Sequence, residues 1–314
     1  MKKKEFMESN GKATLFLIPF MFNFIFLGMI PLFIGFLSSF FKFDTQNLTY
    51  IEFVGLENYV DWIFKSNVYS DWFWGAMKTT ALFTLVVVPL RIIIPLGLAF
   101  LLSFKPFGYK FFQGVLYFPT VISVSIVGIL FVGVFGDTSD SLFNATFGTS
   151  IQWLKGNTTR WVVIILANLW NGVGSNAIIL LAAINNVPKS LGEACEADGG
   201  NWWTRFCTVI LPNIKGSIEI VFFTSIISSF NLYGLPMVIT SSIHSSKIES
   251  PMELIQWMLN DHSRFSGLIT GFSIVFGFFV AIVTVIQRWA MRKKKGGDKY
   301  AKRYVEYKKS KEMA

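Results

Sequence analysis

Six long apolar runs restrict the fold of this chain more than any other feature of its sequence. A run of about 20 apolar residues is long enough to cross the ~30 Å hydrocarbon core of a bilayer as a helix. Charged residues make up only 15% of the chain, against about 25% in a soluble domain. The sequence therefore predicts an all-α polytopic membrane protein with about six transmembrane helices. The predicted spans are residues 13–41, 79–104, 114–135, 161–184, 217–240 and 266–291.

The distribution of lysine and arginine predicts the orientation of these spans. With the N-terminus inside, the inner segments hold 20 of the 28 basic residues and the outer segments hold seven. Cytoplasmic loops of membrane proteins are enriched in Lys and Arg, so both termini are expected in the cytoplasm. The predicted organisation is a cytoplasmic tail at 1–12, a transmembrane domain at 13–291 and a basic tail at 292–314, which is expected to contact membrane lipid. The net charge of +9 therefore reflects orientation in a membrane, and we expect no binding to nucleic acid.

A polar segment at residues 187–216, between the fourth and fifth runs, predicts a helix, a turn and a second helix on the cytoplasmic side. Asn186 is expected to cap the first helix. Gly199 is expected to end that helix in the left-handed conformation, with a positive φ. Asn201 is expected to cap the second helix, and Pro212 to end it.

This segment resembles the EAA loop of permease subunits of ABC importers, the loop through which such a subunit binds its ATPase. The resemblance rests on residue types at fixed offsets: Glu193, Ala194, Asp198, Gly199, Phe206, Leu211 and Pro212. The small residues allow a partner surface to approach closely, and the two acids are acceptors for a basic residue on that partner. The resemblance implies a cytoplasmic helix-turn-helix coupling loop. From the residues alone, an amphipathic linker with aromatic side chains in the membrane interface is an equal alternative.

Further segments resemble the sugar-type permeases of the maltose and glycerol-phosphate importers. They are Phe53–Tyr59, Tyr117-Phe118-Pro119, and Trp170 with Gly172 and Gly174. The chain departs from the family pattern at Cys195 and Gly200, where alanine is usual, and at Thr240-Ser241-Ser242, which lacks the usual Gly-Gly-Pro. The resemblance implies a permease subunit that forms half of a translocation path for a sugar or oligosaccharide.

The same resemblance implies the partners and the location of this chain. A second homologous permease subunit completes the path, a cytoplasmic ATPase dimer binds the coupling loop, and an extracellular solute-binding protein delivers the sugar substrate. The implied location is the cell membrane of a bacterium, with several membrane passes.

The chain itself is expected to be a transport subunit and not an enzyme. It has no Walker-type phosphate loop and no set of catalytic residues, so ATP and Mg are expected on the partner ATPase and no cofactor on this chain. No metal site is expected, because Cys195 and Cys207 have no histidine nearby.

Two other function classes remain open. An ATP-independent secondary transporter or channel for a small polar solute usually shows inverted repeats or broken spans in matching halves, and only Pro89 and Pro95 hint at a break. A membrane-embedded enzyme would need catalytic groups that the sequence lacks.

Polar residues at membrane depth are the candidates for the solute path. Arg91 lies near the centre of the second span, where a charge is costly and normally faces a cavity or a paired group. Amides and hydroxyls of the kind that bind sugars follow in the fourth and fifth spans. Each of them could equally form a hydrogen bond between helices. Because no cluster of basic residues joins them, a neutral sugar or oligosaccharide is expected rather than a phosphorylated solute. These candidates are Asn168, Asn171, Ser228, Asn231 and Tyr233.

Overall fold

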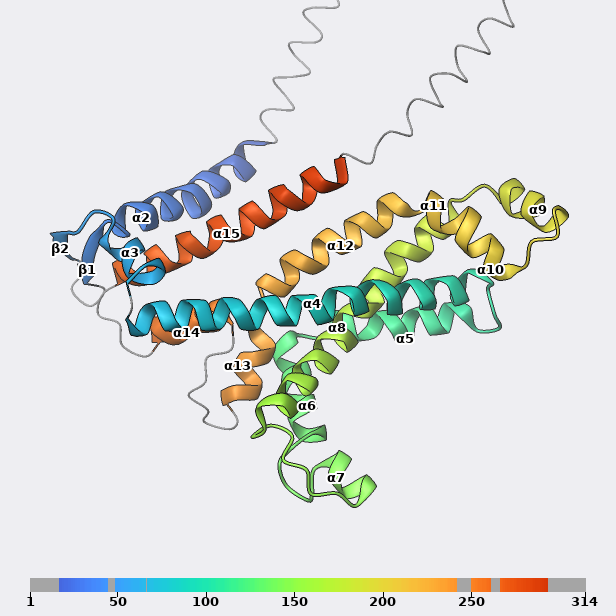
Figure 1. Cartoon of the computed structure of the whole chain (residues 1–314), viewed down its shortest axis with the longest axis horizontal. Helices are drawn as coiled ribbons and strands as arrows, with labels where there is room; N and C mark the ends of the chain where they lie inside the picture. Colours follow the sequence, from blue (N-terminus) through green and yellow to red (C-terminus); the bar gives the residue numbers. More distant parts are fainter. Residues whose placement is uncertain (1–16, 45–48, 66, 242–249, 261–265, 293–314) are drawn as a thin grey trace, which may run out of the picture. The chain divides into compact units, whose positions relative to one another are not determined.

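A computed structural model describes residues 17–44, 49–65, 67–241, 250–260 and 266–292 of the chain. The chain divides into two compact units. The first comprises Met1–Phe73 and Ile255–Phe278, and the second comprises Trp74–Leu254 and Phe279–Ala314. Helices predominate in both units (Figure 1), as predicted for an all-α membrane protein.

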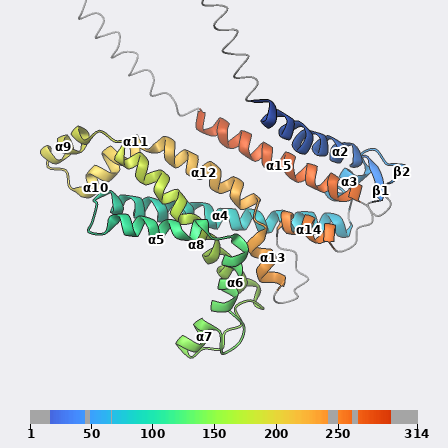
Figure 2. The same cartoon turned by 180° about the vertical axis from the view of Figure 1, so that it is seen from behind.

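In the first unit, the N-terminal helix lies beside the first half of the C-terminal helix (Figures 1 and 2). The N-terminal helix runs over Leu17–Ser38 and includes a π-helical stretch, η1 (Phe24–Met29), followed by α2 (Ile30–Ser38). The C-terminal helix is α15 (Ser266–Arg292), which α14 (Pro251–Asn260) precedes. A Cβ atom on Gly35 would lie 3.4 Å from Thr270 Cγ2, so a small residue lets the two helices pack closely.

The segment after the N-terminal helix forms a β-hairpin and a short helix, which the sequence patterns did not predict. Strand β1 (Phe41–Asp44) pairs antiparallel with β2 (Thr49–Phe53), and α3 (Glu57–Ile63) follows. Trp62 in α3 is fully buried, and its Nε1 donates to the Leu268 carbonyl at 2.8 Å. Its ring centroid lies 4.7 Å from that of Phe272 in α15. The large buried area of such a ring makes Trp62 a core residue of this unit.

The second unit is built on two long helices, α8 (Asn157–Asn185) and the part of α4 (Val68–Ser103) that follows Phe73. The buried positions of α8 recur three and four residues apart, which is the period of a helix packed along one face. The backbones of α8 and α5 (Tyr109–Val121) touch, because a Cβ on Gly174 would lie 1.9 Å from the Leu116 carbonyl oxygen. Only glycine fits at that position. Helix α4 continues through Pro89 and Pro95.

The third and fifth predicted spans are broken helices. Helix α5 bends by 99° into α6 (Val124–Val134), and α12 (Lys215–Phe230) is separated from α13 (Gly234–Ser241) by a short turn. Helices α6 and α13 pack on each other where a Cβ on Gly128 would lie 2.9 Å from Val238 Cβ. The prediction of continuous helices over 114–135 and 217–240 is therefore wrong. Hydropathy does not register a break whose free backbone groups are hydrogen-bonded by side chains from another helix.

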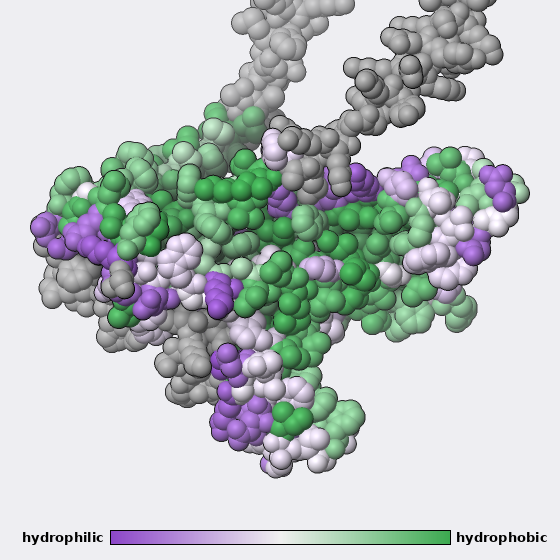
Figure 3. Space-filling model, viewed as in Figure 1, coloured by the Kyte–Doolittle hydropathy of each residue, from purple (hydrophilic) through white to green (hydrophobic). Residues whose placement is uncertain are grey.

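Four described helices are long and apolar enough to cross a membrane, and there are up to six spans if each of two bent helix pairs is counted as one. The second span begins at Val68 and not at the predicted Thr79, because a helix tolerates the polar residues of its first turns outside the hydrocarbon. Hydrophobic residues cover the sides of the helices of the second unit (Figure 3). Hydrophilic residues gather around 189–205 and around α7 (Leu142–Phe147).

Candidate functional site

The predicted helix-turn-helix between the fourth and fifth spans is present. Gly199 has a φ of +80°, as predicted for the residue that ends the first helix. Asn201 caps the second helix, since its side-chain oxygen accepts from the Thr204 N–H at 2.8 Å. The elements are α9 (Lys189–Ala197), then α10 (Trp202–Arg205), the π-helical stretch η2 (Phe206–Ile210) and α11 (Leu211–Asn213).

Two details of the predicted helix ends are wrong. Pro188 is the N-cap of α9, whereas Asn186 caps the C-terminal end of α8, because α8 extends as far as Asn185. Pro212 lies in the first turn of α11, where its missing N–H costs little, and the helical run continues to Asn213. The run then bends by 70° into α12. The π-helical stretch before Pro212 is one of the recognised ways in which a helix accommodates a local disruption.

Contacts across the turn hold α9 and α10 together. Arg205 Nη1 lies 2.7 Å from Glu196 Oε1. The guanidinium rests against α9 at Gly192, where a Cβ would lie 2.8 Å from Arg205 Cζ. At the turn, a Cβ on Gly200 would lie 2.6 Å from Cys195 Sγ. The helix-turn-helix is therefore held by its own residues as one unit. The sequence reasoning missed the Arg205–Glu196 pair, although opposite charges on either side of a predicted turn are a usable signal.

The two faces of this coupling loop differ in exposure. Of the seven residues that carry the family resemblance, two are half-buried, Phe206 and Leu211. Phe206 packs on the end of α4, with its ring centroid 4.6 Å from that of Phe100. Ile210 and Ile214 are buried in the same cluster as Ile184 of α8. The second helix thus anchors the loop to the spans, while α9 and the turn are free to meet a partner. The exposed residues are Glu193, Ala194, Asp198, Gly199 and Pro212.

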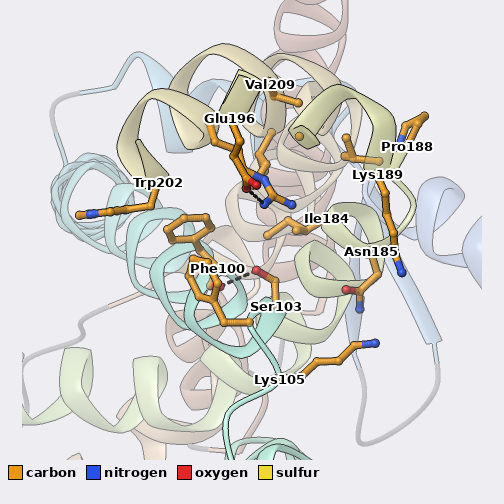
Figure 4. Close-up of a pocket in the computed structure, with 15 residues that line it drawn as sticks. Phe100, Ser103, Lys105, Ile184, Asn185, Pro188, Lys189, Glu196, Trp202 and Val209 are labelled. Carbon is orange, nitrogen blue, oxygen red and sulfur yellow. Dashed lines mark hydrogen bonds and ion pairs between the residues drawn. The ribbon is translucent and has the colours of Figure 1, made fainter. Parts of the chain in front are cut away.

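A cavity of about 580 Å³ lies between the coupling loop and the ends of α4 and α8. Its walls come from the last turn of α4, the last turn of α8, α9 and the α10–η2 run (Figure 4). The Arg205–Glu196 pair forms part of the lining.

Arg91 is the centre of a hydrogen-bonded group between α4, α8 and α12. Its Nη1 donates to Ser228 Oγ at 2.9 Å and its Nη2 donates to the Asn168 carbonyl at 3.4 Å. Asn176 donates to the Arg91 carbonyl at 3.1 Å. Gly172 makes room for the guanidinium, because a Cβ there would lie 2.7 Å from Arg91 Nη2. The structure thus brings together three of the residues predicted for the solute path.

Several buried donors and acceptors of this polar group have no hydrogen-bond partner among the residues that the structure describes. Arg91 is 8% exposed, and within the described residues no carboxylate forms an ion pair with it. Arg91 Nε in α4, Asn168 Oδ1 in α8 and Ser225 Oγ in α12 are buried without a hydrogen-bond partner in the described ranges. Ser225 lies one helical turn from Ser228. Buried polar atoms are normally bonded, so this group has capacity for water, solute or a neighbouring subunit.

The remaining predicted path residues lie at the two helix breaks. Asn171 Nδ2 donates to the Pro119 carbonyl at 2.8 Å and to the Ile122 carbonyl at 3.5 Å. The Asn171 amide therefore satisfies the carbonyl groups that are left free where α5 meets α6. Asn231 is the C-cap of α12 and is exposed, and the half-buried Tyr233 follows it in the turn before α13. Backbone breaks at membrane depth occur where protein or a water-filled cavity covers them.

No cofactor or metal can be assigned to these residues. In the parts of the chain that the structure describes, no group of three His, Cys, Asp or Glu side chains is placed to hold a metal ion. The expectation that this chain carries no cofactor therefore stays a prediction.

Comparison with known sequences gives one family and several relatives. The family described as "Binding-protein-dependent transport system inner membrane component" matches residues 92–296. The probable starch degradation products transport system permease protein AmyD of Thermoanaerobacterium thermosulfurigenes is 25% identical over 299 residues, covering 93% of this chain and 98% of AmyD. The arabinooligosaccharides transport system permease protein AraP of Bacillus subtilis is 29% identical over 233 residues, covering 73% of this chain and 72% of AraP.

Comparison with solved structures gives the same fold. One chain of a bacterial alginate ABC transporter, solved in complex with an alginate pentasaccharide-bound periplasmic protein, superposes with a TM-score of 0.74. The match covers 93% of this chain and 98% of that chain, at 18% sequence identity. The coupling loop and the helix breaks α5–α6 and α12–α13 all lie within the part of the sequence matched by the family, residues 92–296.

Proposed function

Because this chain belongs to the family of binding-protein-dependent transport system inner membrane components, we propose that it carries a sugar or oligosaccharide into a bacterial cell as one of two permease subunits. It is a multi-pass membrane transport component and not an enzyme. In the proposed complex, an ATPase dimer binds the coupling loop from the cytoplasm and an extracellular solute-binding protein delivers the solute. Both termini are then cytoplasmic. ATP and Mg belong to the ATPase.

The observation that carries this proposal is the two-sided coupling loop. Its exposed side presents two acids, a small residue and a left-handed glycine, Gly199, at which a partner surface can approach the backbone. Its other side is fixed to the ends of α4 and α8 through Phe206 and Ile210. A displacement of the loop by a closing ATPase therefore reaches two spans that meet at Arg91. A packed interface with two discrete arrangements transmits such a shift as a rigid-body motion.

The proposed solute class rests on the relatives and on the polar groups at membrane depth. AmyD is named for starch degradation products and AraP for arabinooligosaccharides. In this chain the side-chain groups near the breaks are amides and a phenol, Asn171, Asn231 and Tyr233, which suit the hydroxyls of a sugar. Arg91 is the only basic side chain among the described members of this polar group, and a highly anionic solute would normally demand more positive charge in so costly a setting. These features favour a neutral sugar or oligosaccharide.

Crosslinking tests the coupling assignment. In a chain with Cys195→Ala and Cys207→Ala, a cysteine at Asp198 should crosslink to the ATPase with a short bifunctional reagent. A cysteine at Lys110 is the matched control, because Lys110 is exposed at the start of α5 and outside the coupling loop. Equal crosslinking from Lys110, or none from Asp198, would refute the assignment of the loop.

Uptake tests the solute class. Cells with and without this chain should differ in uptake of a labelled oligosaccharide from a panel of saccharides, polyols and glycerol phosphate. Asn231→Ala and Tyr233→Ala should reduce that uptake while the complex still assembles. Asn23→Ala is the control, since Asn23 is an exposed amide in the N-terminal helix. Unchanged sugar uptake in both variants, with glycerol phosphate as the transported solute, would overturn the proposal.

A further inference from the structure

The cavity behind the coupling loop has the size of a small-molecule site. Its volume of about 580 Å³ lies within the range of roughly 300–1,000 Å³ that is typical of ligand pockets. Its inner wall is apolar, with Ile184 and Ile210 almost fully buried. The solute path proposed above does not use it. The cavity therefore calls for an occupant of its own.

The mouth of this cavity is basic. Figure 4 shows the side chains of Lys105, Asn185 and Lys189 reaching toward the same side of the cavity, with their nitrogen atoms gathered there. Within the described residues neither lysine forms an ion pair. The acid of the lining, Glu196, is already paired with Arg205 at 2.7 Å. Two ammonium groups and one amide donor are thus available to an anion.

Lys105 has an unusual backbone conformation. Its φ is +51°, and it is the one described residue other than glycine with a positive φ. It lies two residues beyond the end of α4, with its N–H bonded to the Leu102 carbonyl at 3.0 Å. Glycine is the residue that normally occupies such a helix end, because a side chain there is disfavoured. A lysine in a strained backbone position at the mouth of a cavity points to a use for its side chain.

The surroundings favour a lipid as the source of the anion. Phe104 and Trp202 line the cavity and are 56% and 60% exposed. The neighbouring Phe107 is fully exposed. Exposed aromatic rings at the end of a span mark the membrane interface. An amphiphile can place an acyl chain beside these rings while its phosphate meets the lysines.

We propose that this cavity binds the headgroup of an anionic phospholipid of the cytoplasmic leaflet. Lys105 and Lys189 bind the phosphate as point charges, and the Asn185 amide donates to it. The bound lipid fills the space between the coupling loop and the ends of α4 and α8. This site does not depend on which solute the chain carries.

Lipid binding to the intact complex tests the proposal. The complex that co-purifies with a tagged full-length chain is placed in nanodiscs of phosphatidylcholine with and without phosphatidylglycerol, and bound lipid is measured by native mass spectrometry. Lys105→Gln with Lys189→Gln should lower retained phosphatidylglycerol about 10- to 30-fold, as expected for the loss of two cations near an anionic headgroup. Lys110→Gln with Lys215→Gln removes the same charge outside the cavity lining and should change it less than about twofold. Equal losses in both pairs would refute a specific site.

Two further arms separate the alternatives. Lys105→Gly removes the charge and suits the left-handed backbone, so it should raise the thermal stability of the complex and still lower lipid retention. A loss of stability together with unchanged lipid retention would show that Lys105 is structural only. Inorganic phosphate is titrated into the complex in neutral detergent. If millimolar phosphate raised the thermal stability of the complex, and the complex retained phosphatidylglycerol no better than phosphatidylcholine, the cavity would be assigned to a soluble phosphate. That result would overturn the lipid proposal.

Discussion

Substitution of Gly199 tests whether the turn of the coupling loop needs its left-handed backbone. The residue has φ +80°, and a Cβ built on it meets nothing within 4 Å. A substitution there changes backbone strain and no contact within the chain. The left-handed conformation costs an L-residue roughly 1–2 kcal/mol, which lowers the population of the native turn about 5- to 30-fold. Asparagine adopts this region more readily, and a β-branched residue is a genuine outlier in it.

The rate of solute-stimulated ATP hydrolysis should therefore be highest in the unchanged chain with Gly199. It should fall through Gly199→Asn and Gly199→Ala and be lowest in Gly199→Val. The assay uses the reconstituted complex, and the amount of chain in the membrane fraction reports insertion, which should not change. Gly216→Val is the matched control, because its Cβ also meets nothing within 4 Å and its φ is not positive. Normal coupling in Gly199→Val would refute the argument. Asparagine as damaging as valine would show that close approach of a partner, and not φ, is the constraint.

Three further predictions concern the spans and the orientation of the chain. Gly174→Ala places a Cβ 1.9 Å from the Leu116 carbonyl oxygen and should destabilise the complex by roughly 1–3 kcal/mol. The measurement is the melting temperature of the complex in detergent, which should fall. An unchanged melting temperature would contradict the backbone contact of α5 and α8. Ser228→Ala removes an acceptor of Arg91 and should lower the stability of the complex by roughly 1–3 kcal/mol. The double variant Ser228→Ala with Arg91→Met should lose less stability than the sum of the losses in the two single variants. Losses that simply add would contradict the pairing of the two residues. An impermeant maleimide should label Ser139→Cys in intact cells and leave native Cys207 unlabelled, and the reverse would overturn the orientation.

The sequence was sufficient to predict the features that depend on local chemistry. The apolar runs predicted the spans, and Gly199 and Asn201 predicted the turn and the second cap of the coupling loop. Each of these rests on an intrinsic preference: burial of apolar side chains, a left-handed glycine, and a short polar side chain at a helix start. Such preferences act within a few residues, so one sequence is enough to reveal them.

Features that depend on distant partners were not predicted. The break between α5 and α6 is stabilised by Asn171, which lies in another helix. The role of Gly172 as the space for Arg91 depends on the packing of α4 against α8. In both cases the deciding contact joins residues of different helices. The hairpin of β1 and β2 is local and was missed for another reason, because its residues lie in a segment that the apolar pattern treated only as an outer loop.

The coupling loop also separates two tasks along the chain. The ion pair between α9 and α10 lies within residues 189–205, whereas the anchoring side chains Phe206, Ile210 and Ile214 follow it. Recombination that exchanges 189–205 between related genes therefore retains these buried anchoring residues, although it replaces Trp202, whose ring centroid lies 6.0 Å from that of Phe100 in α4. A crossover beyond Ile214 instead imports foreign anchoring residues. Under the proposed function, exchange of this one short stretch of coding sequence replaces the surface offered to the ATPase and keeps the side chains that anchor it to the membrane spans.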